Sequence, residues 1–141
     1  MSEMSEMSEI IPKIFIGSIN DAGDEVQLIA NNITHVICCI GDWTPAERYI
    51  TIENILYIPL EDNAKQCISS AIKTASEFIK KDSTGNYLVH CHQGISRSTS
   101  IVAGYLIREH NMDVKSALEL IKEKRACSDP NSGFVRQLNS L

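Results

Sequence analysis

Residues 87–105 read YLVHCHQGISRSTSIVAGY, and this stretch decides the fold of the chain. The apolar run at residues 87–89 predicts a buried strand, because it is too short to form a helix. Beyond it, Ile101, Val102 and Tyr105 recur at helical spacing and predict a helix with one buried face. A strand that turns at once into a helix leaves backbone N–H groups unpaired beside the positive end of the helix dipole. We therefore expect an anion-binding loop between the two elements.

Three residues of this loop suit the handling of a phosphate group. Cys91 follows the strand, where the N–H groups and a nearby guanidinium favour the thiolate; such settings lower a cysteine pKa from about 8.5 to roughly 3.5–7.5. Arg97 supplies a planar, two-pronged donor that fits two phosphate oxygens. Gly94 lets the chain turn and lets an anion approach the backbone. A nucleophile surrounded by such donors predicts phosphoryl transfer to sulfur.

The motif itself is specific. Residues 90–98 read HCHQGISRS, in which a histidine and a cysteine are followed, after five residues, by an arginine and a serine. This pattern resembles the signature of the cysteine-dependent protein phosphatases and, in its fuller form, that of the dual-specificity protein phosphatases. Rhodanese-like and arsenate-reductase sites share the bare cysteine–arginine spacing, so the specificity comes from the flanking histidine, glycine and serine together with the preceding strand and the following helix. Lipid phosphatases tend to carry lysines inside the loop, and none lies between His92 and Ser96.

The resemblance implies a role for each residue of the motif. Cys91 would be the nucleophile, Ser98 would hydrogen-bond its sulfur and help it leave, and His90 would hold the loop through its ring. Phosphate binding would fall on the loop residues His92, Gln93, Gly94, Ile95, Ser96 and Arg97. No set of histidine, cysteine and aspartate residues has the spacing of metal ligands, so we expect neither a metal nor another cofactor.

A second chemical element follows the strand predicted at residues 50–60. Cleavage of a phosphate ester needs a proton on the departing oxygen, which a positioned carboxylic acid can give. Loops at the carboxyl ends of sheet strands are where such residues gather in open α/β folds. The Ile-Pro-x-x-Asp context of residues 58–62 resembles that of the family's general acid, which assigns the role to Asp62. Glu61 is the alternative acid.

The whole pattern predicts an α/β fold with a mainly parallel central sheet of four to five strands flanked by helices. Pro12 indicates that the first strand lies at an edge, because proline cannot donate to a ladder. The expected strands are residues 10–16, 33–40, 50–60 and 87–90; the expected helices are 21–31, 67–81, one that follows the loop and ends at Asn111, one capped by Asp113, and one capped by Asn131 or Ser132. Pro59 is expected to end its strand.

The two ends of the chain have different interpretations. Residues 1–9 are three copies of Met-Ser-Glu, a period that matches neither helix nor strand, and they predict a disordered tail. The resemblance covers residues 10–141, which it identifies as a dual-specificity phosphatase catalytic domain. Near the end, Pro-Asn-x-Gly-Phe at residues 130–134 is similar to the family pattern, and we expect Asn131 to contact the active-site loop.

Composition limits the function further. The chain has 141 residues, 43% of them hydrophobic, which suits one compact domain. A net charge of −5 argues against a nucleic-acid or membrane-surface partner, which would need a basic face. Five cysteines without disulfide-framework spacing indicate a reducing compartment, and no apolar run is long enough for a membrane span. We expect a soluble, monomeric, cytoplasmic or nuclear protein whose partner is a phosphoprotein substrate.

Several single residues allow two interpretations. His35 lies in a core strand, where hydrogen-bonded structure is the favoured interpretation over function. Trp43 either covers one end of the core or forms a wall of the substrate cleft. Cys67 and Cys127 are the candidates for resolving an oxidised catalytic cysteine.

Two rival functions come from other classes. One rival is a non-catalytic interaction module that binds phosphorylated groups without hydrolysing them. Such a module would usually lack the cysteine, and Cys91 is intact. An RNA 5′-phosphatase would keep the loop, but the acidic balance and the lack of a basic patch speak against it.

Overall fold

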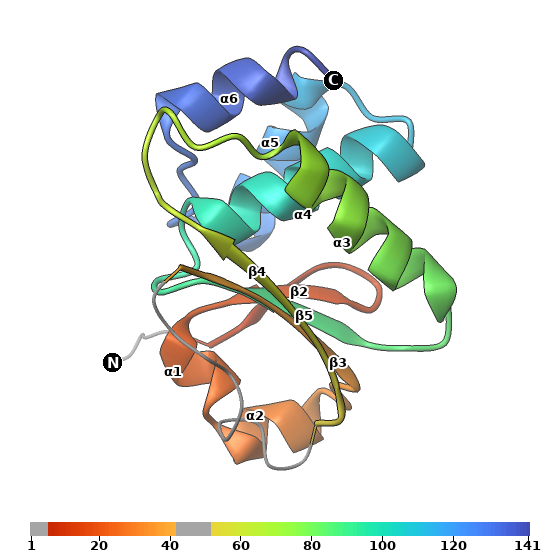
Figure 1. Cartoon of the computed structure of the whole chain (residues 1–141). Helices are drawn as coiled ribbons and strands as arrows, with labels where there is room; N and C mark the ends of the chain where they lie inside the picture. Colours follow the sequence, from red (N-terminus) through yellow and green to blue (C-terminus); the bar gives the residue numbers. More distant parts are fainter. Residues whose placement is uncertain (1–5, 42–51) are drawn as a thin grey trace.

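The computed structural model describes residues 6–41 and 52–141, and its centre is a five-stranded sheet (Figure 1). The strands are β1 (Ser8–Ile11), β2 (Ile14–Gly17), β3 (His35–Ile40), β4 (Asn54–Leu60) and β5 (Tyr87–His90), in the order β1-β2-β5-β3-β4. Strands β2, β5, β3 and β4 pair in parallel, and only β1 pairs antiparallel, with β2. The predicted mainly parallel α/β sheet is confirmed.

Helices cover both faces of this sheet (Figure 1). On one face lie α1 (Ile19–Ala22) and α2 (Glu25–Ala30); on the other lie α3 (Ser69–Lys81), α4 (Arg97–Glu109), α5 (Val114–Lys124) and α6 (Ser132–Leu138). Alternate strand residues face the two layers, as the pleat requires. Ile37 and Val89 pack in the large core shared with the longer helices, whereas Val36 and Leu88 pack with Leu28 of α2.

The N-terminal segment differs from the prediction of one edge strand over residues 10–16. It forms a hairpin in which β1 and β2 are joined at Pro12 and Lys13, and Lys13 adopts a positive φ of 77°. Strand β1 begins at Ser8, which pairs with Ile16, and Met7 is buried. The disordered tail predicted for residues 1–9 is therefore too long. Ser8 and Glu9 are ordered because they pair with β2, although the side chains of β1 show no alternation that would have indicated a strand.

Two further boundaries are corrected by the structure. The single helix predicted at residues 21–31 is divided into α1 and α2, because Asp24 caps a new helix by accepting from the N–H groups of Val26 and Gln27. The expectation that Pro59 ends its strand is wrong, because β4 runs through Pro59 to Leu60. Strand β4 lies at the edge of the sheet, where proline is tolerated because its missing N–H need not serve a neighbouring strand. The predicted caps Asp113 and Asn131 are confirmed.

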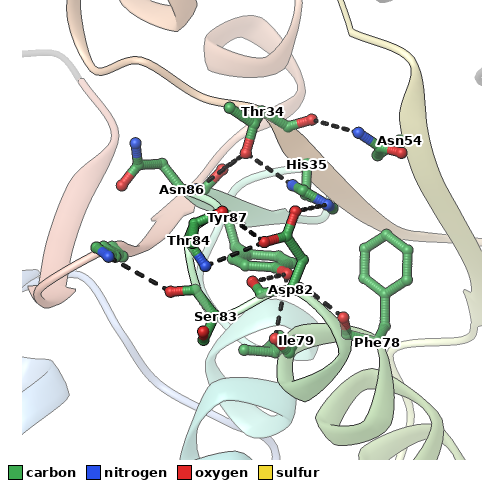
Figure 2. A network of polar contacts seen from close by, with 11 residues as sticks. Thr34, His35, Asn54, Phe78, Ile79, Asp82, Ser83, Thr84, Asn86 and Tyr87 are labelled. Carbon is green, nitrogen blue, oxygen red and sulfur yellow. Dashed lines mark hydrogen bonds and ion pairs between the residues drawn. The ribbon is translucent and has the colours of Figure 1, made fainter.

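The ring of His35 is part of a polar network at the amino ends of β3 and β5 (Figure 2). Its Nδ1 lies 2.7 Å from the Thr34 hydroxyl oxygen, and its Nε2 lies 3.6 Å from a carboxylate oxygen of Asp82. The ring packs on Tyr87 with centroids 4.4 Å apart, and the Tyr87 hydroxyl donates to the Asp82 carbonyl at 2.7 Å. The histidine is hydrogen-bonded, as expected for a core strand, and it lies at the opposite ends of these strands from Cys91.

Candidate active site

The loop of residues 91–96 joins the carboxyl end of β5, a strand inside the sheet, to the first turn of α4. Gly94 turns the chain here with a φ of 70°, a conformation that L side chains rarely adopt. A Cβ atom at this position would lie 2.6 Å from both the Gly17 carbonyl oxygen and Nη2 of Arg125. Both the backbone conformation and the close packing therefore require a glycine.

The carbonyl groups of this loop are held from behind. Four consecutive carbonyl oxygens accept hydrogen bonds: that of His92 from the N–H of Ile19 (2.9 Å), those of Gln93 and Gly94 from the guanidinium of Arg125 (3.2 and 2.8 Å), and that of Ile95 from the N–H of Asp129 (2.8 Å). Within a peptide plane the N–H points opposite to the C=O. The N–H groups that follow these carbonyls therefore point to the opposite side of the loop, and that of Gly94 hydrogen-bonds the Cys91 thiol.

Cys91 is buried, with 2% of its surface exposed, and its Sγ lies 3.2 Å from the hydroxyl oxygen of Ser98. Burial raises the pKa of the Cys91 thiol. Hydrogen bonds from Ser98 and from the backbone of Gly94, together with the charge of Arg97, outweigh burial, so the pKa lies below its ordinary value. The site therefore favours the thiolate, which is the nucleophilic form.

Arg97 begins α4 and connects the loop to the neighbouring strand. Its Nη1 donates a 3.0 Å hydrogen bond to the carbonyl oxygen of Leu60, the last residue of β4. This contact fixes the half-buried guanidinium beside the cleft and leaves its other donors available to an anion.

Asp62 lies on the wall of the same cleft and is held by Asn131, whose side-chain N–H donates to its Oδ1 at 2.9 Å. The backbone N–H of Asn131 also donates to the hydroxyl of Ser96 at 3.0 Å, so the predicted contact of Asn131 with the loop is confirmed. Glu61, the alternative acid, does not line this cleft; its carboxylate lies against Gly41. The geometry favours Asp62 as the acid.

These residues line one cleft of about 600 Å³, formed by Asp62, Cys91, His92, Gln93, Ile95, Ser96, Arg97, Asp129, Pro130, Asn131 and Ser132. Gly94 lies behind it. His90 also lies behind it: its ring is fully buried, its Nδ1 is 3.3 Å from the Cys91 carbonyl oxygen, and burial lowers its pKa to about 4. At neutral pH this ring is therefore uncharged, and it contacts the backbone of the loop.

The sequence did not identify Asp129, Pro130 and Ser132 as lining residues, although their place around the Pro-Asn motif was a usable signal. Arg125 was also missed, because it is 31 residues from Gly94 and follows no local pattern. Trp43, the proposed cleft wall, lies outside the described residues. Cys67 and Cys127 are both exposed, and neither lines the cleft around Cys91.

A thiol at the end of a central parallel strand, facing backbone N–H donors and a fixed guanidinium, defines the class of cysteine-based phosphate sites on α/β sheets. Comparison with known proteins places the chain within this class. Residues 14–141 match the family described as "Dual specificity phosphatase, catalytic domain". The chain therefore belongs to the dual-specificity phosphatase family.

Individual relatives agree with this assignment. Mouse dual specificity protein phosphatase 22 is 33% identical over 141 residues, covering 97% of this chain and 74% of that protein. A probable rhodanese domain-containing dual specificity protein phosphatase of Dictyostelium discoideum is 37% identical over 134 residues; the match covers 93% of this chain but only 28% of that protein. The crystal structure of DUSP15 superposes with a TM-score of 0.89 at 34% identity, covering 96% of this chain and 86% of that one.

One further finding concerns membranes. In the described part of the chain, no helix is both long enough and apolar enough to cross a bilayer.

Proposed function

We propose that this chain is a protein phosphatase that hydrolyses phosphotyrosine and phosphoserine or phosphothreonine through a phosphocysteine intermediate. The observation that carries the proposal is the Cys91 thiol, which has a lowered pKa, lies 3.2 Å from the Ser98 hydroxyl, and shares a cleft with Arg97 and Asp62. The family to which the chain belongs supports the same activity.

In the first step the Cys91 thiolate attacks phosphorus in line with the ester oxygen. The new S–P bond forms as the P–O bond to the substrate breaks, and Asp62 gives its proton to the departing oxygen. Meanwhile the guanidinium of Arg97 and the loop N–H groups hold the equatorial oxygens, where charge develops. The hydrogen bond from Asn131 holds the carboxyl of Asp62 on the wall of the cleft that Cys91 also lines, which supports this role.

In the second step a water molecule attacks the phosphocysteine. Asp62, now ionised, takes a proton from the water, inorganic phosphate forms, and sulfur leaves as the thiolate. The hydroxyl of Ser98 is placed to donate a hydrogen bond to that sulfur and so to stabilise the leaving thiolate. Each step therefore uses the same few residues, and the enzyme returns to its starting state.

The shape of the cleft supports activity on both kinds of phosphorylated side chain. Its floor is the loop of residues 91–97, and its rim includes the exposed side chains of His92 and Gln93. We infer that this pocket is shallow, so that it accepts both the distant phosphate of phosphotyrosine and the closer phosphate of phosphothreonine. We further propose that the protein acts as a monomer in the cytoplasm or nucleus, on phosphoproteins and not on nucleic acid or membrane surfaces.

The test is hydrolysis of a substrate panel by the wild type and by Cys91→Ser. We expect phosphotyrosine and phosphothreonine peptides to be hydrolysed with kcat/KM values within about 10⁴ of each other. Phosphoinositides and triphosphorylated RNA should be poor substrates. Preferential hydrolysis of the RNA would favour an RNA 5′-phosphatase, and binding of phosphopeptides without turnover would favour a non-catalytic module. Cys91→Ser should lose all measurable activity, because a serine hydroxyl is not ionised at neutral pH.

A further inference from the structure

Arg125, at the C-terminal cap of α5, is a buried arginine with 6% of its surface exposed. Its guanidinium makes four hydrogen bonds, and every acceptor is an uncharged oxygen. Nε donates to the Gly94 carbonyl at 2.8 Å and Nη2 to the Gln93 carbonyl at 3.2 Å, while Nη1 donates to the Glu6 carbonyl at 3.0 Å and to the Ser8 hydroxyl at 3.1 Å. Within residues 6–41 and 52–141, no carboxylate lies within ion-pair distance of it.

A buried cation without a carboxylate partner is costly to maintain for stability alone. Desolvation of a charged group costs several kcal/mol, and hydrogen bonds to neutral carbonyls recover only part of that cost. A chain that needed only tight packing at this place could use an apolar residue. The position of the charge therefore points to a role at the neighbouring loop.

The contact with the loop is specific to the peptide groups that face the phosphate. The two bonds from Arg125 hold the carbonyls of Gln93 and Gly94 on the outer side, which turns the N–H groups of Gly94 and Ile95 inward. Nη2 also lies 2.6 Å from where a Cβ of Gly94 would be, so the guanidinium packs directly on the loop. A planar guanidinium donates to both carbonyls in a fixed geometry, whereas the rotating donors of an ammonium group do not fix the two peptide planes in the same way.

The other side of the guanidinium is fixed by the N-terminal segment. Its bonds to Glu6 and Ser8 connect the loop to the start of β1, more than 80 residues away in sequence. The four acceptors thus hold Arg125 from two directions and fix the plane of its guanidinium group.

We propose that Arg125 is a positioning residue for the phosphatase reaction, which orients the N–H groups of Gly94 and Ile95 toward the phosphate and places a second positive charge behind the loop. The proposal rests on the function proposed above and extends it to a residue that touches neither substrate nor Cys91. The other titratable or charged groups that act on the Cys91 thiol, among the described residues, are Arg97 and Cys39.

The test uses Arg125→Gln and Arg125→Lys in the full chain, with Arg108→Gln as the matched loss of charge. Arg108 is an exposed arginine in the last turn of α4, at the end of that helix remote from the loop. Two readouts need no turnover: the pH dependence of Cys91 alkylation by iodoacetamide, followed by peptide mass, and the concentration of inorganic phosphate that halves the alkylation rate. The melting temperature is recorded for each variant.

If Arg125 positions the loop, Arg125→Gln raises the half-protective phosphate concentration at least tenfold and moves the alkylation profile to higher pH. Arg125→Lys falls between Arg125→Gln and the wild type, and Arg108→Gln changes phosphate protection less than twofold. If Arg125→Gln lowers only the melting temperature and matches Arg108→Gln in both alkylation readouts, Arg125 is structural and the proposal is wrong. Should Arg125→Gln not fold, Arg125→Lys decides; if neither folds, the proposal also fails.

Failure of the proposed function gives a different result. In that case the wild type hydrolyses no phosphoester, yet phosphate still protects Cys91 and protection still depends on Arg125. The positioning role would then belong to a phosphate-binding site without turnover.

Discussion

Ser98→Ala is the substitution whose effect follows most directly from the geometry. The Ser98 hydroxyl is buried and lies 3.2 Å from Sγ of Cys91, where it can donate to the thiolate. A hydrogen bond to a charged group contributes about 1.5–3 kcal/mol. At about 1.4 kcal/mol per factor of ten, even the lower end of this range changes the thiol–thiolate equilibrium by about tenfold.

The direction of the change in the pKa of Cys91 depends on whether the hydrogen bond stabilises the thiol or the thiolate. The hydroxyl favours the thiolate, so its removal raises the pKa of Cys91 and reduces the thiolate fraction at any pH below that pKa. The rate of Cys91 alkylation at such a pH should fall about tenfold in Ser98→Ala. Turnover should become limited by breakdown of the phosphocysteine, because the sulfur that leaves in that step has lost its donor, and a burst of released phenol should appear with an aryl phosphate.

The assay pairs stopped-flow hydrolysis of an aryl phosphate with alkylation across the pH range. Ser116→Ala, which removes an exposed hydroxyl on α5, is the matched control and should behave as the wild type. An alkylation profile identical to that of the wild type would refute the reasoning, because the 3.2 Å contact would then not act on the thiolate.

Three other predictions concern the acid, the metal requirement and the loop. Asp62→Asn should slow substrates with basic leaving groups about 10²–10⁴-fold and those with good leaving groups far less; equal losses on both would remove Asp62 from the role. Activity should survive EDTA, because Arg97 and the N–H groups supply the positive charge; a loss restored by Zn²⁺ or Mg²⁺ would contradict this. Gly94→Ala should lower the free energy of unfolding by about 1–3 kcal/mol, since its Cβ would meet oxygen and nitrogen atoms at 2.6 Å with φ at 70°. Gly23→Ala, whose nearest neighbour would lie 3.7 Å away, should change it little, and equal melting temperatures for the two variants would contradict the packing argument.

The sequence predicted what depends on local pattern. The strand, loop and helix around Cys91 follow one another within residues 87–105, so their periodicity and turn residues were sufficient to predict the anion site. Asn131 was also found locally, since its side chain caps α6 by accepting from the N–H of Phe134. Its second role, the hydrogen bond to Asp62, joins residues 69 positions apart and became visible only in the structure.

What the sequence could not predict depends on strand order and on distant pairing. Pro59 is tolerated inside β4 because β4 lies at the edge of the sheet, a position that is set by the order in which the strands pair. Strand β1 forms because β2 turns back beside it, although its side chains show no alternation. Arg125 has no local signature, and its importance follows only from the carbonyls that it reaches.

The central claim is that phosphate passes through sulfur at Cys91. Rapid denaturation at alkaline pH within the first turnovers of an aryl phosphate with a good leaving group, followed by peptide mass analysis, tests it most directly. With such a substrate Asp62→Asn should increase the amount trapped, because formation of the intermediate is little affected while water attack loses its base. The account predicts a phosphorylated Cys91 peptide that forms with the first turnover and is absent from Cys91→Ser. Hydrolysis at the full rate with no phosphocysteine, or retained activity in Cys91→Ser, would contradict it.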